Sequence, residues 1–202
     1  MKLLVATTNQ HKLREIAPLL AGTGLNLVTL SDLPPVPEPE ETGATFWENA
    51  RLKALAYSRA TGLATVAEDS GLVVDALGGE PGVRSARFLG ANVSYPARFD
   101  EIYRRLATIP GERHAACFVT ALVMADGGSI VYETESRIEG VIAPRPAGSH
   151  GFGYDPIFLY PPLARTTAEM TSEEKAAVSH RARAFRDLRR ALATDLVAIL
   201  KG

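Results

Sequence analysis

The chain has 202 residues and a formal net charge of −1, with 46% hydrophobic and 22% charged residues. This composition is ordinary for a folded protein, and it excludes collagen, a long coiled coil and general disorder. The balanced charge argues against a general nucleic-acid coat protein, because such proteins carry a basic excess. We therefore expect one domain over residues 1–202, or two small lobes, with a sizeable buried core.

The single cysteine, Cys117, excludes an internal disulfide and a cysteine-rich zinc site. No stretch approaches the roughly 18 apolar residues that a membrane-spanning helix needs. The opening apolar run at residues 3–6 is too short for a signal peptide, and polar residues follow it at once. These features predict a cytoplasmic protein that binds neither membranes nor nucleic acid.

The first elements read as strand, helix and strand. Residues 3–6 predict a buried strand, and residues 11–20 carry apolar side chains at helical spacing, with Pro18 expected to kink or shorten the helix. Residues 25–30 predict a second strand. A strand, helix, strand order favours a parallel pair of strands.

The next segment combines a stiff loop, a helix and two short strands. Residues 31–44 are rich in proline and glutamate, which predicts an acidic loop. Thr45 is a suitable N-cap for a helix that runs to residue 56. Residues 64–67 and 72–77 predict strands, and we expect the intervening Glu68-Asp69-Ser70-Gly71 to be a tight turn.

The second half of the chain predicts one helix, a hairpin and a final long helix. The helix covers residues 99–106, and the strands 114–125 and 130–143 are joined by a turn at Asp126-Gly127-Gly128. A capping box that starts at Thr171 begins an amphipathic helix expected to run towards Leu200. Mixed strands and helices throughout indicate an α/β fold, with a hairpin-rich lobe beside a parallel core.

Polar residues gather at the ends of these elements, where binding groups usually lie. At the first strand-to-helix turn, backbone N–H groups, the positive end of the helix dipole and Lys12 favour an anion, most naturally phosphate. The alternative is simple capping by Thr8 or Asn9 with Lys12 in solvent. The segment consists of Thr7, Thr8, Asn9, Gln10, His11 and Lys12.

A second group of candidates is acidic. Glu40 and Glu41 lie in the proline-rich loop, and the pair Glu68-Asp69 follows an apolar strand. Hard oxygen ligands favour Mg²⁺ or Mn²⁺, and Mg²⁺ needs only one or two protein carboxylates beside substrate phosphates. The alternative for the loop glutamates is a solvated charge run, whereas the position of Asp69 favours a functional role.

Two further segments carry groups that suit a purine nucleotide. In the glycine-rich stretch 148–155, Phe152 and Tyr154 offer flat faces to a base and Asp155 can accept from ring N–H groups. The alternative is a loop with packed aromatic side chains. On the last helix, Lys175 shares a face with Ser179, and His180 and Arg181 flank that face. Cations of these types suit phosphate or a purine carbonyl, and the alternative is a solvated helix face.

Six motifs in this order resemble the non-canonical purine nucleoside triphosphate pyrophosphatases, the inosine/xanthosine triphosphatases. The resemblance covers nearly the whole chain. The motifs are Thr7-x-Asn9-x-x-Lys12-x-x-Glu15, Glu41-Thr42-Gly43-x-Thr45-Phe46-x-Glu48-Asn49-Ala50, Glu68-Asp69-Ser70-Gly71-Leu72, Gly82-x-x-Ser85-Ala86-Arg87, Gly151-Phe152-Gly153-Tyr154-Asp155-Pro156-Ile157-Phe158 and Ser179-His180-Arg181.

This resemblance implies an enzyme. Such proteins hydrolyse ITP, dITP or XTP to the monophosphate and pyrophosphate with Mg²⁺, which removes deaminated purines from the nucleotide pool. The resemblance also implies a homodimer and an α/β fold, with a mixed twisted sheet, flanking helices and two lobes around a central substrate cleft.

The resemblance also implies roles for single residues. The segment 7–12 would hold the triphosphate, and Asp69 would bind the metal and orient or deprotonate the attacking water. Glu41 would be the second acidic metal contact, with Glu40 as the alternative. The substrate contacts implied are Ser70, Phe152, Gly153, Tyr154, Asp155, Lys175, His180 and Arg181.

Recognition of the base follows from its 6-position. A donor such as Arg181 or His180, or a backbone N–H, would favour the 6-carbonyl of hypoxanthine and xanthine over the 6-amino group of adenine. Guanine also has a 6-carbonyl, so its rejection needs another feature. Thr8 and Ala176 depart from the residues common in the family, Gly or Ser and Asn respectively, which affects substrate preference more than turnover.

Two other functions stay open at this point. One is a nucleotide-binding sensor without turnover, which the intact acidic residues argue against. The other is a related pyrophosphatase that acts on modified pyrimidine or methylated nucleotides. The segments that suit a purine nucleotide argue against it.

Overall fold

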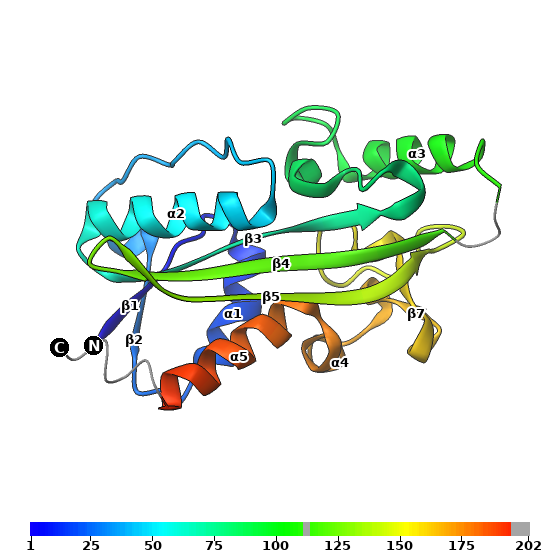
Figure 1. The fold of residues 1–202 in the computed structure, drawn as a ribbon. Coiled ribbons are helices and arrows are strands. Elements are labelled where there is room, and N and C mark those ends of the chain that lie inside the picture. Colours follow the sequence, from blue (N-terminus) through cyan, green and yellow to red (C-terminus); the bar gives the residue numbers. More distant parts are fainter. Residues whose placement is uncertain (111–113, 195–202) are drawn as a thin grey trace. The chain divides into compact units, whose positions relative to one another are not determined.

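The computed structural model describes residues 1–110 and 114–194, and one seven-stranded sheet runs through it in the order β2-β1-β3-β4-β5-β6-β7 (Figure 1). The strands are β1 (Lys2–Val5), β2 (Asn26–Thr29), β3 (Ala64–Val74), β4 (Ala115–Asp126), β5 (Ser129–Ile142), β6 (Phe158–Tyr160) and β7 (Arg165–Thr166). The α-helices are α1 (Gln10–Leu20), α2 (Phe46–Thr61), α3 (Tyr95–Leu106), α4 (Ser172–Val178) and α5 (His180–Thr194).

The sheet is mixed, as expected. β1 pairs in parallel with both β2 and β3, whereas β5, β6 and β7 pair antiparallel. β4 and β5 are joined at Gly127-Gly128, where both glycines have positive φ angles of 55° and 75°. Two left-handed residues in succession form the turn that matches the twist of a two-residue hairpin, so the predicted hairpin is confirmed.

The described residues divide into two compact units. Unit 1 comprises residues 1–69, 120–136 and 180–202, of which the last eight lie outside the described part; unit 2 comprises residues 70–119 and 137–179. The strands β3, β4 and β5 each supply residues to both units. The prediction of two lobes from the resemblance agrees with this division.

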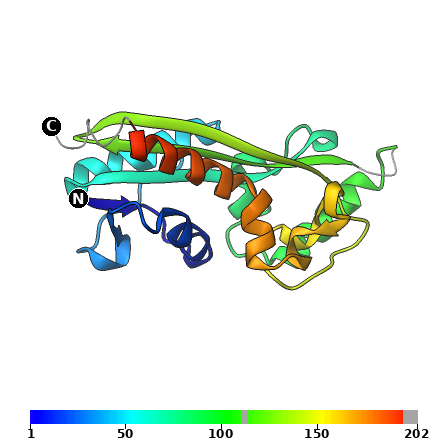
Figure 2. The same cartoon turned by 90° about the horizontal axis from the view of Figure 1, so that it is seen from below.

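Unit 1 has a separate core on each face of its strands, because side chains alternate along a strand. Leu3, Val5 and Val66 pack with α1 and α5, whereas Leu4 and Ala67 pack with α2. Figure 1 shows α2 on one side of these strands with α1 and α5 on the other, and Figure 2 shows the second face from below.

Unit 2 has one core, in which α3 packs against the strands. Phe99 and Ile102 of α3 lie in one cluster with Leu72, Phe118 and Phe158. The rings of Phe118 and Phe158 are 4.5 Å apart between centroids. This core anchors the glycine-rich segment, since Tyr154 and Ile157 belong to the same cluster.

Two predictions of elements are wrong. β3 continues through Glu68–Gly71 as a strand, so the expected turn there does not exist. Two adjacent acidic residues favour an exposed turn, but these carboxylates are buried beside charged partners from other parts of the chain. The glycine at position 71 serves close packing, since a Cβ there would lie 2.3 Å from Ser85 Oγ and 2.5 Å from the Gly82 carbonyl oxygen.

The predicted C-terminal helix is also two helices. The backbone of Ser179 is extended, with φ −63° and ψ 150°, which ends α4 and lets α5 begin at His180. The part of the prediction that extends from residue 195 towards Leu200 lies outside the described residues. Among the helices that the structure does describe, none is long and apolar enough to cross a membrane.

The packing of α5 gives a stability prediction. Phe185 is 1% exposed in the core that α5 shares with α1, so Phe185→Ala should lower the free energy of unfolding by about 3–5 kcal/mol in urea titrations. Leu163→Ala, which truncates a side chain in a residue 41% exposed, should change it by less than about 1 kcal/mol. Equal losses in the two variants would contradict this description of the core.

Candidate active site

The strand β3 presents two adjacent carboxylates to opposite faces of unit 1. Glu68 continues the row of Val66 and Asp69 continues the row of Ala67, because side chains along a strand alternate. Glu68 therefore meets α1 and α5, and Asp69 meets α2. Both residues are almost completely buried, at 3% and 6% exposure.

Asp69 lies beside a buried lysine and a second carboxylate. Lys53 Nζ of α2 is 2.6 Å from Glu41 Oε1 and 3.3 Å from Asp69 Oδ1. Both carboxylates lie within 3.3 Å of one nitrogen, so their two oxygens are at most twice that distance apart. The structure thus brings Glu41 and Asp69 together, although 28 positions separate them in the sequence.

The protonation of this group reflects burial and its neighbours. Burial raises the pKa of Asp69, while Lys53 opposes the rise and Glu41 adds to it. Burial alone would lower the pKa of Lys53, but the carboxylates of Asp69 and Glu41 outweigh burial and raise it. Lys53 therefore stays protonated, and Asp69 is a carboxylate with increased affinity for a proton.

The oxygen pair of Glu41 and Asp69 fits a hard divalent cation. The Lys53 ammonium lies within ion-pair distance of both oxygens, so the pair already binds one positive charge. Within residues 1–110 and 114–194 there is no group of three or more His, Cys, Asp or Glu side chains arranged to hold a metal ion. Two carboxylates suffice for Mg²⁺ only where other ligands, such as substrate phosphates or water, complete the shell.

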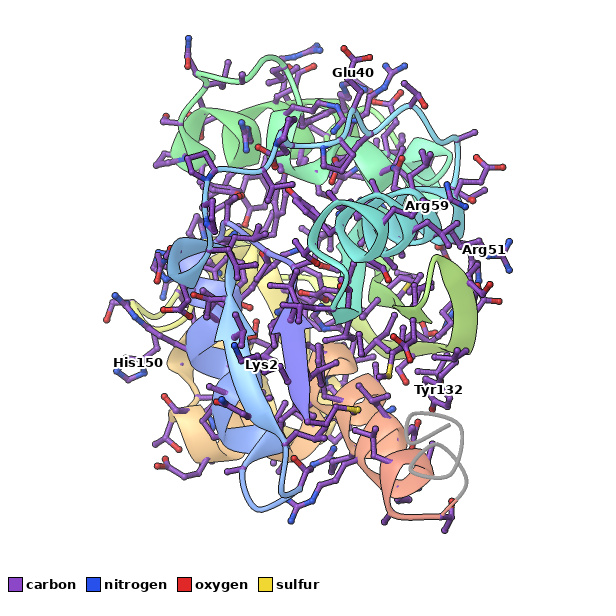
Figure 3. The ribbon with its side chains drawn as sticks, turned by 90° about the vertical axis from the view of Figure 1, so that its left-hand side faces the viewer. Lys2, Glu40, Arg51, Arg59, Tyr132 and His150 are labelled. Carbon is purple, nitrogen blue, oxygen red and sulfur yellow. The ribbon has the colours of Figure 1, made fainter. Side chains whose placement is uncertain are left out.

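Glu40 is not part of this group. Its side chain is exposed and lies at the outer surface (Figure 3), whereas Glu41 is partly buried against Lys53. Of the two glutamates left open by the sequence, Glu41 is the one that the structure places beside Asp69.

Glu68 is the centre of a second, separate network. Arg181 Nε of α5 donates to Glu68 Oε1 at 2.7 Å, and Arg181 Nη1 donates to Glu15 Oε2 at 2.6 Å. Lys12 Nζ lies 3.5 Å from Glu68 Oε1, and the Thr120 hydroxyl donates to Oε2 at 3.3 Å. The network thus joins α1, β3, β4 and α5.

These cations control the charge of Glu68. Burial alone would raise its pKa, but Arg181 and Lys12 outweigh burial and lower it to about 2. Burial lowers the pKa of Lys12, and the nearby Arg181 and Lys53 act in the same direction while Glu68 opposes them. The site therefore holds Lys12 in a partly desolvated position, where its charge interacts strongly with an anion.

Asn9 caps the helix at the first strand-to-helix turn, as one of the two interpretations of the sequence predicts. Asn9 Oδ1 accepts from the backbone N–H of His11 at 2.9 Å and of Lys12 at 3.3 Å, and the Thr7 hydroxyl accepts from Asn9 N–H. Lys12 is not in solvent, however, since it points to Glu68. Thr8, Gln10 and His11 are exposed around this turn.

Unit 2 contains another buried carboxylate among the predicted site residues. Lys175 Nζ lies 2.6 Å from Asp155 Oδ2, which also accepts from Phe152 N–H at 2.7 Å. The Thr167 hydroxyl donates to Asp155 Oδ1 at 2.7 Å. The ammonium of Lys175 is 5.1 Å from the centroid of the Phe152 ring. Gly151 permits this arrangement, because its φ is +72° and a Cβ there would collide with Asp155.

Several predicted substrate contacts have structural roles in this arrangement. The Tyr154 side chain is buried in the core, and its hydroxyl donates to the Ser85 carbonyl at 3.0 Å, so its ring is a packed aromatic. Arg181 is 2% exposed and held by two carboxylates within unit 1. His180 is buried at the start of α5. Ser70 follows Asp69 in β3, and Gly153 has a left-handed φ of 65° next to Tyr154.

Sequence reasoning assigned no role to Lys53, Asn49 or Thr167, although Asn49 stands in one of the six family motifs. Lys53 and Asn49 are four residues apart on α2 and both are buried, beside the buried Ala50 and Ala54. Polar residues on the apolar face of an amphipathic helix were the available signal, because such groups are rarely buried without a partner. Nothing in the local sequence distinguishes Thr167.

The Glu68 network gives a prediction about stability and pH. A carboxylate with a depressed pKa stabilises the fold above its unfolded value, and this contribution is lost as the pH falls from about 4.5 towards 2. Glu68→Gln removes the carboxylate that Arg181 and Lys12 share and leaves Arg181 with Glu15, so it should cost about 3 kcal/mol at pH 7 in urea unfolding. The difference from the unchanged protein should shrink towards pH 2.

The control for this prediction is Glu139→Gln, which removes an exposed carboxylate of the same type. We expect that variant to change the free energy of unfolding by less than about 1 kcal/mol. A loss for Glu68→Gln that is no larger than for this control would show that Glu68 is not the centre of the network.

Comparison with known proteins assigns the chain to a family. The Ham1 family model matches residues 3–191. The chain is 46% identical over 184 residues to a dITP/XTP pyrophosphatase of Geobacter sulfurreducens, with 91% of this chain and 92% of that protein covered. It is 49% identical over 186 residues to a dITP/XTP pyrophosphatase of Symbiobacterium thermophilum, with 91% of both chains covered.

Solved structures agree with the fold. A HAM1 protein from Coxiella burnetii is similar with a TM-score of 0.89 at 35% identity, over 96% of this chain and 98% of that one. A nucleoside-triphosphatase / dITP/XTP pyrophosphatase from Mycobacterium abscessus has a TM-score of 0.75 at 46% identity, over 93% of this chain and 98% of that one. The matched model, the relatives and the shared fold show that this chain belongs to the Ham1 family.

Proposed function

We propose that this protein hydrolyses non-canonical purine nucleoside triphosphates, namely ITP, dITP and XTP, to the monophosphate and pyrophosphate. The observation that carries the proposal is the group of Asp69, Glu41 and Lys53, buried on one face of β3. Relatives 46% and 49% identical to this chain are dITP/XTP pyrophosphatases, which supports the same substrate class here.

Asp69 is the proposed proton acceptor. Water attacks the α-phosphorus, the bond from that phosphorus to the α–β bridging oxygen breaks, and the electron pair leaves with pyrophosphate. The proton of the attacking water passes to a carboxylate oxygen of Asp69. Burial raises the pKa of Asp69 while Lys53 opposes the rise, so its carboxylate is a better proton acceptor than that of an ordinary aspartate.

Lys53 and Lys12 are the proposed cationic contacts of the phosphates. A nucleoside triphosphate carries about four negative charges, and charge builds up on the leaving pyrophosphate during the reaction. Both lysines are largely buried and held by carboxylates, which fixes their positions before substrate binds. Preorganised cations of this kind stabilise a transition state without further rearrangement. The exposed polar groups of the 7–12 turn are proposed to contact the same phosphates.

We propose Mg²⁺ as the cofactor, with Asp69 and Glu41 as its protein ligands. The two oxygens that already hold the Lys53 ammonium are of the type that Mg²⁺ prefers. When bound, the ion would neutralise phosphate charge and polarise the reacting phosphorus. Lys53 would then remain beside the carboxylates as a third positive group for the triphosphate.

The Asp155 group of unit 2 is the proposed contact for the purine base. Asp155 holds Lys175 and the Phe152 backbone in fixed positions, which presents a cation and a ring together. An ammonium donates to a 6-carbonyl but finds no acceptor in the 6-amino group of adenine. An unpaired polar group in a dry site reduces the rate for the wrong substrate by factors of up to about 10⁴.

Arg181 and His180 are also proposed to contribute to base recognition, on the basis of the family motif. The contacts of Arg181 with Glu68 and Glu15 give it a second role, since they hold α5 against α1. The nucleotide sensor and the pyrophosphatase for modified pyrimidine or methylated nucleotides are the alternatives. The buried group of two carboxylates and one lysine, Asp69, Glu41 and Lys53, favours an enzyme with turnover over a nucleotide sensor.

A homodimer and a cytoplasmic location are further proposals that rest on the family resemblance and on composition. Cys117, the single cysteine of the chain, is buried, which agrees with a reducing compartment.

A substrate panel tests the proposed activity. With Mg²⁺ present, release of pyrophosphate from ITP, dITP and XTP should exceed release from ATP and GTP by at least about 10²-fold in kcat/KM. The preference over ATP follows because adenine has no 6-carbonyl for the donor of the site, whereas the preference over GTP is expected from the family resemblance alone. Removing Mg²⁺ with a chelator should abolish release. Equal rates on all five nucleotides would refute the assignment to non-canonical purines, and saturable ITP binding without product would establish the sensor instead.

The role of Asp69 is tested by Asp69→Asn. The amide keeps the size of the carboxyl group but cannot accept a proton, so kcat should fall by about 10²–10⁴-fold while KM for ITP changes by only a few fold. Asp100→Asn removes an exposed carboxylate on α3 and should leave both constants unchanged. Near-normal turnover in Asp69→Asn would remove Asp69 from the chemistry.

A further inference from the structure

The side-chain amide of Asn49 joins the two acidic segments of the site. Asn49 lies on α2, is completely buried and has partners at both ends of its carboxamide. Its Oδ1 accepts from the Gly43 backbone N–H at 2.8 Å, and its Nδ2 donates to Asp69 Oδ2 at 3.2 Å. One side chain therefore contacts both the loop that carries Glu41 and the strand that carries Asp69.

The contact with the loop requires a glycine. A Cβ at position 43 would lie 2.6 Å from Glu48 Cβ and 2.7 Å from Asn49 Oδ1, so any larger residue pushes the loop away from α2. Glu41 is two residues before Gly43, and its own carboxylate reaches Lys53 on the same helix. The position of Glu41 thus depends on how closely the loop approaches α2.

The neighbouring hydrogen bonds hold the same turn to the start of the helix. Thr45 Oγ1 accepts from Glu48 N–H at 3.1 Å, and Glu48 Oε2 accepts from Ala44 N–H at 2.6 Å. These two bonds fix the helix start, as expected for a capping arrangement. They touch neither Glu41 nor Asp69. Asn49 links the loop backbone to Asp69, beside Lys53, which contacts both carboxylates.

Asn49 and Lys53 together hold Asp69 by both oxygens. They are four residues apart and share one face of α2, with Lys53 on Oδ1 and Asn49 on Oδ2. Lys53 contributes positive charge, whereas Asn49 orients the Asp69 carboxylate, because the N–H groups of a planar amide donate in fixed directions. The amide of Asn49 can donate to a carboxylate through its nitrogen and accept from a backbone N–H through its oxygen at the same time.

We propose that Asn49 is the positioning residue of this site: its carboxamide fixes the Glu41 loop and the Asp69 carboxylate relative to each other. This inference rests on the proposed function, in which Glu41 and Asp69 are the reacting or metal-binding groups. Asn49 acts through its two neighbours, the Asp69 carboxylate and the backbone N–H of Gly43.

The test compares substitutions that remove one or both contacts. Asn49→Ala removes both. Asn49→Asp keeps an acceptor for Gly43 N–H but replaces the donor to Asp69 with a negative oxygen. Gly43→Ala disturbs the loop contact from the other side. Ser58→Ala is the matched control, since it removes another buried polar group of α2, whose hydroxyl has no hydrogen-bond partner among the described residues.

Three quantities are measured for each variant. Hydrogen exchange of the Gly43 amide, followed by NMR, reports the loop contact directly and needs neither metal nor substrate. Kinetics with ITP separate kcat from KM. Urea unfolding reports the free energy of unfolding, which shows whether a variant has merely weakened the fold.

The proposal predicts a distinct pattern for each variant. Asn49→Ala should lose the protection of the Gly43 amide and lower kcat by about 10- to 100-fold, with KM changed by only a few fold. Asn49→Asp should lower kcat similarly but retain Gly43 protection. Gly43→Ala should resemble Asn49→Ala. The double variant Gly43→Ala/Asn49→Ala should have a kcat no lower than that of the less active single variant, because both substitutions act on one contact. Ser58→Ala should behave as the unchanged protein.

Other results would overturn the proposal. Unchanged Gly43 protection in Asn49→Ala would show that the loop does not depend on this amide. Unchanged kcat in both Asn49 variants would show that the acidic groups keep their geometry without it. A loss of protection throughout α2, with a matching loss of unfolding free energy, would show a structural role only. If the unchanged protein released no pyrophosphate, the proposed function would fail, while Gly43 exchange would still test the contact.

Discussion

The burial of adjacent carboxylates in a strand dominates the organisation of unit 1. A buried ionised group is costly unless charged or hydrogen-bonding partners surround it. Glu68 and Asp69 point to opposite faces of β3, so each needs its own partners from a different layer of helices. The helices α1 and α5 supply Lys12 and Arg181 on one face, and α2 supplies Lys53 and Asn49 on the other.

This arrangement separates two tasks. The carboxylate of Glu68 is saturated by Arg181, Lys12 and Thr120, and its lowered pKa keeps it ionised, so it serves as a fixed negative charge. Asp69 has a raised pKa and shares its lysine with Glu41, so its charge is less fully compensated. The carboxylate with less compensation is the one suited to accept a proton or bind a cation. The physical difference between the neighbours lies in the partners, since both are acids on the same strand.

Unit 2 repeats the principle with a single carboxylate. Asp155 accepts from Thr167 at one oxygen and from Phe152 N–H and Lys175 at the other. Its function in the structure is to hold the lysine and the glycine-rich segment in place. Tyr154, the preceding residue in the sequence, is part of the core and anchors the glycine-rich segment there. Proposed recognition of the base therefore begins from side chains that are already fixed.

The sequence alone determined the α/β class, the mixed sheet, the hairpin at Gly127-Gly128, the Thr45 cap and the family resemblance, because each depends on local periodicity, turn chemistry or short motifs. It also indicated a pairing of Asp69 with an acidic residue of the proline-rich loop, Glu41 or Glu40. Only the tertiary structure decided that residues 68–71 continue a strand, that Glu41 and not Glu40 faces Asp69, and that Lys53 and Asn49 join them. The reason is that buried charges obtain their partners from helices far away in the chain, and local sequence does not record those partners.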